Sequence, residues 1–255
     1  MDAESAAEPI LAYNALLEAG EIRPDPTQAL AMEKFQGLHE DLRAYTPQMG
    51  KKGWMTRLSL GRNKVPPPRG LYVWGGVGRG KSMLMDLFFD TAAIKDRKRV
   101  HFHAFMQEVH KRVHSFREAV KAGQAPESAD PLVALARVIT DQAWLLCFDE
   151  FHVTDIADAM ILSRLFETLF DQGVVVVATS NRPPRDLYKD GLQRDTFLPF
   201  IDLMEEKLEV LELDAGIDYR LDRLKTMAVY LTPADAKADT LREMNALADN
   251  LRAEG

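Results

Sequence analysis

Residues 75–82 read Gly75-Gly76-Val77-Gly78-Arg79-Gly80-Lys81-Ser82. This octapeptide fits the pattern G-x-x-x-x-G-K-[ST], which is typical of a phosphate-binding loop. Glycines in such a loop let backbone N–H groups turn inward around a phosphate, and the following helix adds a partial positive charge at its first turn. We therefore expect Lys81 to reach the β- and γ-phosphates of a nucleotide, and the Ser82 hydroxyl to ligate Mg²⁺.

The segments on either side of this loop supply the context that the motif needs. Residues 70–74 form an apolar stretch of strand character, and residues 83–89 have the composition of a buried helix. A bare pattern match can arise by chance, whereas the succession of strand, glycine loop and helix is the arrangement that nucleotide binding requires. The sequence therefore predicts an α/β nucleotide-binding fold.

Composition narrows the class of protein. The 255 residues can hold one large domain, or one domain and a small second one, and 46% hydrophobic with 28% charged residues is typical of a globular chain. A net charge of −7 argues against a wholly basic nucleic-acid binder, although a local basic groove stays open. Cys147 is the only cysteine, so no internal disulfide is possible and a reducing compartment such as the cytoplasm is expected. Its apolar neighbours favour a core residue over a nucleophile.

The N-terminal part of the chain is expected to be helical from residue 9 to about residue 44. Asp25 precedes Pro26 in the pattern of a helix cap followed by proline at the first helical position. The turn 24–28 then either packs on the core or lines an adenine pocket. Residues 43–69 are basic and carry interleaved apolar side chains, so they form either a solvated connector or a contact with anionic lipid or nucleic acid.

A second strand is predicted at residues 100–103, followed by a helix with an apolar stripe that ends at Gly123. The strand and helix carry four histidines, and two of them share one helix face. These are His101, His103, His110 and His114. With no cysteine or HExxH motif nearby, partner contacts or helix packing are favoured over a metal site.

The second chemical signal is a strand at residues 145–150 that ends in two carboxylates. Asp149 lies 68 residues after Lys81, which leaves room for a helix, a strand and a second helix between them. Ligands bind at the carboxyl ends of parallel strands. We expect Asp149 to hold Mg²⁺ directly or through water, and Glu150 to orient and polarise an attacking water.

The helix opened by residues 154–155 and closed by Gly173 is expected to turn six apolar side chains inward. These are Ile156, Met160, Leu162, Leu165, Phe166 and Leu169. The following apolar strand, residues 174–181, would lie between the two earlier core strands and place the Asn181 amide beside the γ-phosphate. A turn asparagine before two prolines is the alternative.

Arg194 is placed to act on a neighbouring subunit's nucleotide as an arginine finger, with Arg182 and Arg185 as rivals. The alternative for Arg194 is an ion pair with surface carboxylates.

Five segments together closely resemble the ZapE family. They are GLYVWGGVGRGKS at 70–82, HFHAFMQEVH at 101–110, LCFDEFHVTDIADAM at 146–160, ATSNRPP at 178–184 and GLQRDTFLPFI at 191–201. These bacterial cell-division ATPases belong to the AAA+ superfamily and are related to mitochondrial ATPases that handle respiratory-chain subunits. The resemblance implies a parallel sheet of order 5-1-4-3-2, ATP hydrolysis with Mg²⁺, and self-association, as a hexamer, through arginine fingers. It also implies action on the division protein FtsZ at the inner face of the inner membrane.

The resemblance divides the chain into a helical segment and basic linker at 1–68, an AAA+ core at 69–224 and the start of a C-terminal helical lid at 225–255. Family members usually continue further, so we expect a truncated lid, with turnover and assembly in question. Three hypotheses stay open: an ATPase that remodels a protein partner, a nucleotide-gated binding module with little hydrolysis, and a protein similar to helicase loaders.

Overall fold

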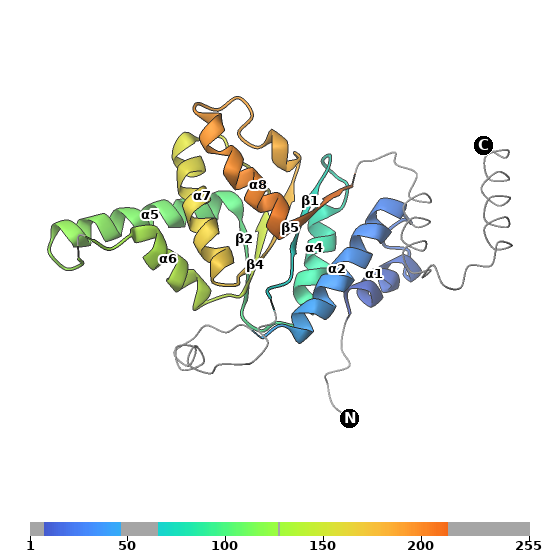
Figure 1. Cartoon of the computed structure of the whole chain (residues 1–255). Coiled ribbons are helices and arrows are strands. Elements are labelled where there is room, and N and C mark those ends of the chain that lie inside the picture. The colour runs from blue at the N-terminus through green and yellow to red at the C-terminus, as the bar shows by residue number, and fades with distance from the viewer. Residues whose placement is uncertain (1–7, 47–65, 127, 214–255) are drawn as a thin grey trace, which may run out of the picture. The chain divides into compact units, whose positions relative to one another are not determined.

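The computed structural model describes residues 8–46, 66–126 and 128–213. Its centre is a parallel sheet in the order β2-β3-β4-β1-β5, shown in Figure 1. The strands are β1 (Gly70–Trp74), β2 (Arg97–His101), β3 (Leu145–Asp149), β4 (Val175–Ser180) and β5 (Leu208–Glu212). Read from the other edge, this is the order 5-1-4-3-2 that the family resemblance implied, and that expectation is confirmed.

Helices cover both faces of the sheet. One face carries α1 (Pro9–Glu18), α2 (Pro26–Ala44) and α4 (Lys81–Thr91). The opposite face carries α5 (Phe102–Lys121), α6 (Pro131–Thr140), α7 (Ile156–Asp171) and α8 (Leu198–Lys207), as Figure 1 shows. Two short 3₁₀ turns, η1 (Pro184–Asp186) and η2 (Arg194–Thr196), follow β4. The helical prediction for residues 9 to about 44 is confirmed, as two helices, α1 and α2.

The core consists of two apolar clusters, one on each face of the sheet, because successive side chains along a strand point to opposite faces. In β3, Leu145 and Cys147 pack with α4 and α2, whereas Leu146 and Phe148 pack with α5 and α7. Each fully buried side chain of this kind contributes roughly 1.5–3 kcal/mol through removal from water. Cys147 is fully buried, and this burial raises the pKa of its thiol. Its expected role as a core residue is therefore confirmed.

The start of β1 needs a glycine because the neighbouring strand passes too close for any side chain. A Cβ atom at Gly70 would lie 1.8 Å from the carbonyl oxygen of Val176 in β4. This close approach seats the strand that leads into the glycine-rich loop directly against β4.

The prediction of a strand at residues 100–103 is wrong in its bounds. The strand occupies Arg97–His101, and Phe102 already begins α5. Strand β2 lies at the sheet edge and pairs with β3 alone, so it accommodates the charged Arg97, Lys98 and Arg99, which hid it from the apolar pattern. Phe102 instead joins the helical stripe of α5 and packs against Phe151.

Two of the six side chains expected to face inward from α7 are exposed. Ile156 is 37% exposed and Met160 is 51% exposed, whereas Leu162, Leu165, Phe166 and Leu169 are buried as predicted. With 3.6 residues per turn, position 160 points almost opposite to position 162 on the helix, so both cannot reach the sheet.

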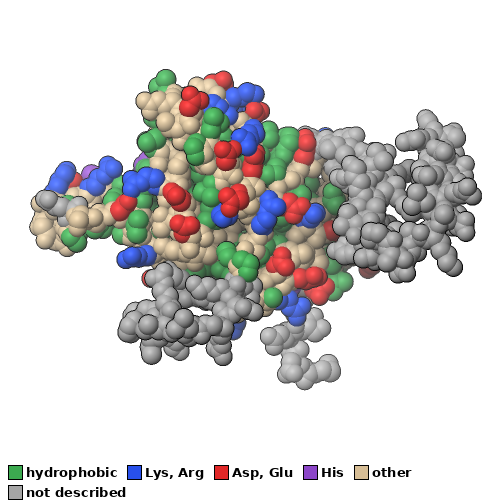
Figure 2. Space-filling view, viewed as in Figure 1, with side chains coloured by type: hydrophobic (Ala, Val, Ile, Leu, Met, Phe, Trp, Pro, Cys, Tyr) green, Lys and Arg blue, Asp and Glu red, His purple; other side chains and the backbone are tan. Residues whose placement is uncertain are grey.

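Surface charge on the described part of the chain is mixed in sign. On the face shown in Figure 2, acidic and basic side chains alternate over the helices. No helix within the described ranges is long and apolar enough to cross a membrane. Residues 47–65 of the basic stretch and the lid expected at 225–255 lie outside the described residues, and the predicted domain bounds stay predictions.

Candidate functional site

The glycine-rich loop joins β1 to α4 and turns through left-handed backbone conformations. Gly78 and Gly80 have φ angles of 79° and 84°, which favour glycine. A Cβ at Gly80 would also lie 2.9 Å from the Gln28 Nε2 atom. Lys81 begins α4 and donates from Nζ to the carbonyl oxygens of Gly75 and Gly76, both at 2.7 Å. Its ammonium group therefore lies against the loop that is expected to receive phosphates.

The end of β4 brings together two motifs that are far apart in the sequence. On one side, the Gly75 N–H donates to the Ser180 carbonyl oxygen at 3.2 Å. On the other side, the Phe151 N–H donates to the Thr179 carbonyl oxygen at 2.7 Å, and the Glu150 N–H donates to the Thr179 hydroxyl at 3.3 Å. Asn181 follows directly after this strand. The expected placement of the Asn181 strand between the other two is therefore confirmed.

Asp149 ends β3 as a buried carboxylate held by an arginine. It is 5% exposed and accepts from Arg99 Nε at 2.7 Å and from Arg99 Nη2 at 3.1 Å. The remaining Nη1 group of Arg99 pairs with Asp86 on α4. Ser82 lies one turn before Asp86 on that helix. The contacts of Arg99 with Asp149 and Asp86 therefore bring Asp149 close to the first turn of α4, which contains Ser82. Sequence reasoning did not identify Arg99 or Asp86.

The residues at this edge fit a magnesium–nucleotide complex. Ser82 offers an exposed hydroxyl and Asp149 a carboxylate, and Mg²⁺ prefers oxygen ligands. The loop beside them has no Cβ at Gly78 or Gly80 to keep phosphates away from its N–H groups. Within the described ranges no group of three or more His, Cys, Asp or Glu side chains gathers as a metal site. Phosphate oxygens and water would complete the coordination of the ion.

Glu150 occupies a strained backbone position at the same edge. Its φ angle is 56°, in the left-handed region that a residue with a side chain rarely adopts. Strained backbone of this kind clusters at catalytic sites, where the surrounding structure holds it in place. Hydrogen bonds from Glu150 and Phe151 to Thr179 supply that support. The turn leaves the Glu150 carboxylate exposed.

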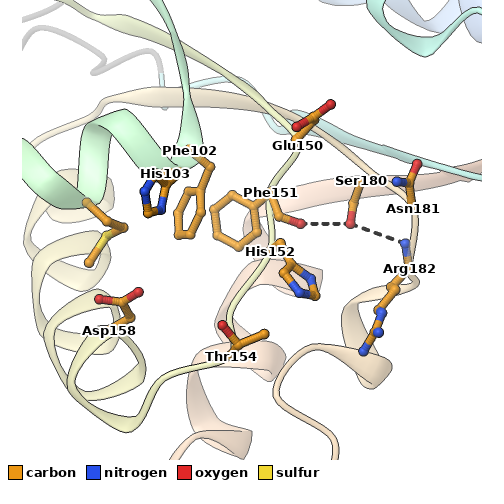
Figure 3. Close-up of a pocket in the computed structure, with 11 residues that line it drawn as sticks. Phe102, His103, Glu150, Phe151, His152, Thr154, Asp158, Ser180, Asn181 and Arg182 are labelled. Atoms are coloured by element: carbon orange, nitrogen blue, oxygen red, sulfur yellow. Dashed lines mark hydrogen bonds between the residues drawn. The ribbon is translucent and has the colours of Figure 1, made fainter. Parts of the chain in front are cut away.

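A pocket of about 500 Å³ opens beside Glu150. Figure 3 shows its walls, which come from the start of α5, the loop 150–154, Asp158 of α7 and residues 180–182. The rings of Phe102 and Phe151, whose centroids lie 4.3 Å apart, form its apolar side. The Ser180 hydroxyl donates to the Phe151 carbonyl oxygen at 2.8 Å and accepts from the Arg182 N–H at 3.2 Å. Sequence reasoning missed the lining by His152 and Thr154, although the alternation of polar and apolar residues over 150–155 after β3 could have marked both.

The three candidate arginines lie in different surroundings. The Arg194 guanidinium donates to the carbonyl oxygens of Leu187 and Arg185. Arg185 pairs with Glu205 and Asp202, and the hydrogen bond that Arg185 donates to the Glu205 carboxylate is the main reason that the pKa of Arg185 is raised. Arg182 lines the pocket, and its guanidinium makes no hydrogen bond or ion pair with any described side chain. The role expected of Arg194 stays a prediction.

The turn 24–28 and the histidines also have definite contacts. Gln28 donates from Nε2 to the Arg79 carbonyl oxygen at 3.1 Å, so the first turn of α2 touches the glycine-rich loop. A base-binding role for that turn stays a prediction. On α5, His110 lies 2.6 Å from an Asp158 oxygen, and His103 lies 3.0 Å from Gln107. These contacts join α5 to α7 and stabilise the first turns of α5.

Comparison with known proteins places the chain in one family. The model of the AFG1-like ATPase family matches residues 7–254. The cell division protein ZapE of Escherichia coli is 41% identical over 88% of this chain and 59% of its own length. Lactation elevated protein 1 homolog B of Danio rerio is 38% identical over 94% of this chain and 55% of its own length. The chain thus spans somewhat more than half the length of these relatives.

Proposed function

The chain belongs to the AFG1-like ATPase family, and from that premise we propose that it binds ATP with Mg²⁺ and hydrolyses it to ADP and phosphate. One observation carries this proposal. At the end of β4 the glycine-rich loop, the Asp149–Glu150 pair and Asn181 lie at one edge of the sheet, joined through hydrogen bonds to Thr179 and Ser180. That is the edge at which ligands bind in parallel sheets.

Each residue has a proposed role in that reaction. The phosphate-binding loop runs from Gly75 to Gly80. The backbone N–H groups of Gly76, Val77, Gly78, Arg79 and Gly80 hold the phosphates, and Gly75, whose N–H donates to Ser180, begins the loop. Lys81 offsets the charge of the phosphates, and Ser82 and Asp149 hold Mg²⁺, which neutralises charge that develops on the phosphate oxygens. Glu150 accepts a proton from the attacking water and orients it, and Asn181 holds that water by its amide. Arg182 or Arg194 reaches the nucleotide of a neighbouring subunit.

We further propose that hydrolysis remodels a protein partner. The relatives include a cell division protein, and by resemblance the partner is an FtsZ-like polymer in the cytoplasm, at the inner face of the inner membrane. A nucleotide-gated binding module with little turnover is the second candidate, because the glycine-rich loop that would bind the nucleotide is separate in sequence from Glu150, on which turnover would depend. A role similar to helicase loading has the least support, since most of the basic stretch 51–69 on which it depends lies outside the described ranges.

ATP hydrolysis by the purified chain, measured across protein concentration, tests the proposal. We expect Mg²⁺-dependent turnover that Lys81→Ala abolishes through lost nucleotide binding. Glu150→Gln should keep binding and lower turnover by at least about 10²-fold, because it removes the general base. Background turnover with intact ATP binding would favour the binding module. Turnover that survives in Glu150→Gln would contradict the role of Glu150.

A further inference from the structure

Arg99 makes contacts that the proposed chemistry has not yet used. It projects from the edge strand β2 toward α4. Its Nε, Nη1 and Nη2 groups all contact the carboxylates of two aspartates. Its Nε and Nη2 atoms hold the two oxygens of Asp149 at 2.7 and 3.1 Å, and its Nη1 atom pairs with Asp86. One guanidinium therefore joins β2, the end of β3 and the second turn of α4.

The two-pronged contact fixes the direction of the Asp149 carboxylate. A planar guanidinium that bonds both oxygens prevents the carboxylate from rotating, which a single ammonium group would not do. Each carboxylate oxygen keeps a further lone pair, so the contact leaves Asp149 able to accept from a metal-bound water. Asp149 is thus held in one orientation before any metal arrives.

Asp86 supplies the charge that makes this arrangement compatible with a cation. An arginine alone would neutralise Asp149 and repel Mg²⁺. With Asp86 on the other side of Arg99, the three side chains carry one negative charge in excess. Asp86 also lies one helical turn after Ser82, so the excess charge lies close to the expected metal position.

Strand pairing does not explain the contact. Strands β2 and β3 pair in register from Arg97 with Leu145 to His101 with Asp149 through their backbones. Nor is it an ordinary surface ion pair, because the side chains of Arg99 and Asp149 are only 22% and 7% exposed. Exposed pairs contribute little, whereas a buried acid that loses its partner is left uncompensated.

We propose that Arg99 is a positioning residue for the metal: it orients Asp149 toward Mg²⁺, and Asp86 balances its charge. This inference rests on the proposed function, since it assumes that Asp149 faces the metal of a bound nucleotide. Arg99 acts through Asp149 and does not itself touch the nucleotide.

The test compares ADP affinity with Mg²⁺ and with EDTA in the purified chain, by titration calorimetry. The dissociation constant in EDTA divided by the dissociation constant with Mg²⁺ gives a ratio that reports the contribution of the metal alone. In Arg99→Met we expect this ratio to fall by about 10–100-fold, as it does when the hydrogen-bond partner of a metal ligand is lost. Affinity in EDTA should stay as in the wild type. In Arg99→Lys the ratio should lie between those of Arg99→Met and the wild type, because lysine restores the positive charge but cannot bond both oxygens of Asp149 as the planar guanidinium does.

Two further variants separate positioning from general stability. Arg97→Met removes an arginine of the same strand that bonds the carbonyl oxygens of Ala92 and Ile94 and stacks on Phe89. It should leave the ratio unchanged. Asp86→Asn should lower the ratio, because Arg99 then neutralises Asp149 fully. Thermal unfolding of each variant confirms that it is folded at the temperature of the titration.

Three results would overturn the inference: an unchanged ratio in Arg99→Met, a ratio that rises there, or an equal fall in Arg97→Met. A rise would mean that Arg99 competes with the metal instead of positioning its ligand. If the wild-type chain binds ADP no better with Mg²⁺ than with EDTA, the proposed function itself fails, and the two failures are thereby distinguished.

Discussion

Glu150 has a backbone conformation that costs stability, at a position where the proposed chemistry needs a carboxylate. Its left-handed backbone, with a φ of 56°, turns the chain sharply at the end of β3 so that the carboxylate emerges beside Asn181. A residue with a Cβ atom in this conformation costs roughly 1–2 kcal/mol. A glycine would avoid that cost, so the strained backbone supports the catalytic role that we propose for the Glu150 side chain.

Comparison of Glu150→Gly with Glu150→Ala tests this strain. Both variants lack the carboxylate and should lose turnover equally. Glu150→Gly should be the more stable by about 1 kcal/mol, because relief of the strain exceeds the extra entropy of an unfolded glycine. Urea unfolding midpoints measure the difference. Equal midpoints would mean that the left-handed turn carries no strain.

At the level of elements, the start of α2 joins the N-terminal helices to the glycine-rich loop. The Asp25 carboxylate caps the helix by accepting from the Thr27 and Gln28 N–H groups at 2.8 and 3.2 Å. Thr27 also donates to the Leu213 carbonyl oxygen after β5, and Gln28 donates to the Arg79 carbonyl oxygen in the glycine-rich loop. One helical turn thereby positions the loop from the side.

Asp25→Ala should therefore lower both stability and nucleotide affinity. Loss of a helix cap costs about 1 kcal/mol. Asp130→Ala is the matched control, because Asp130 caps α6 by the same kind of contact far from the loop in sequence. It should destabilise the protein without changing ADP affinity. If both variants bind ADP as the wild type does, the turn 24–28 does not support the nucleotide site.

The stabilisation by Asp25 has a defined pH dependence. Partial burial would raise the pKa of this carboxyl, but hydrogen bonds from Thr27 and Gln28 outweigh burial and hold the pKa below its ordinary value of 3.8. A group whose pKa is lower in the folded state stabilises the fold fully above its unfolded pKa. The stability difference between wild type and Asp25→Ala should therefore be constant near neutral pH and shrink as the pH falls below 3.8.

At the scale of the whole molecule, the arrangement of arginines bears on assembly. The Arg194 guanidinium holds carbonyl oxygens of its own chain, whereas Arg182 lines the pocket, and in Figure 3 its side chain points away from the Asn181 amide. An arginine finger supplied by a neighbour can contribute about 10³–10⁵-fold in rate. For such a residue the catalytic site is complete only when two subunits meet.

Mixing two inactive variants tests whether an arginine acts in this way. Lys81→Ala lacks a working nucleotide site but keeps its arginines, and Arg182→Ala has the opposite defect. If Arg182 acts on a neighbouring subunit, the mixture should recover turnover that neither variant shows alone. The same mixture with Arg194→Ala identifies the finger if Arg194 is the residue that acts. No recovery in either mixture would exclude action between subunits for both.

The nucleotide-binding loop, the paired carboxylates and the strand that carries Asn181 were all predictable before any coordinates, because each depends on local order along the chain. Glycine spacing determines a loop, apolar runs mark buried strands, and polar tips mark strand ends. The cap at Asp25 and the burial of Cys147 were predictable for the same reason. The sheet order followed from family resemblance, since it depends on long-range pairing that no local pattern specifies.

Other features depend on contacts between distant segments, and only the folded chain determines them. The edge position of β2 displaced the predicted strand by three residues at its start, because an edge tolerates charges that a central strand would exclude. The exposure of Met160 is different, because helical periodicity along the sequence already places it opposite to Leu162. The contact of Arg99 with both Asp149 and Asp86 joins three elements, and Asp149 lies 50 residues after Arg99 in the sequence. Such contacts arise from packing in three dimensions, for which the linear order of residues carries no signal.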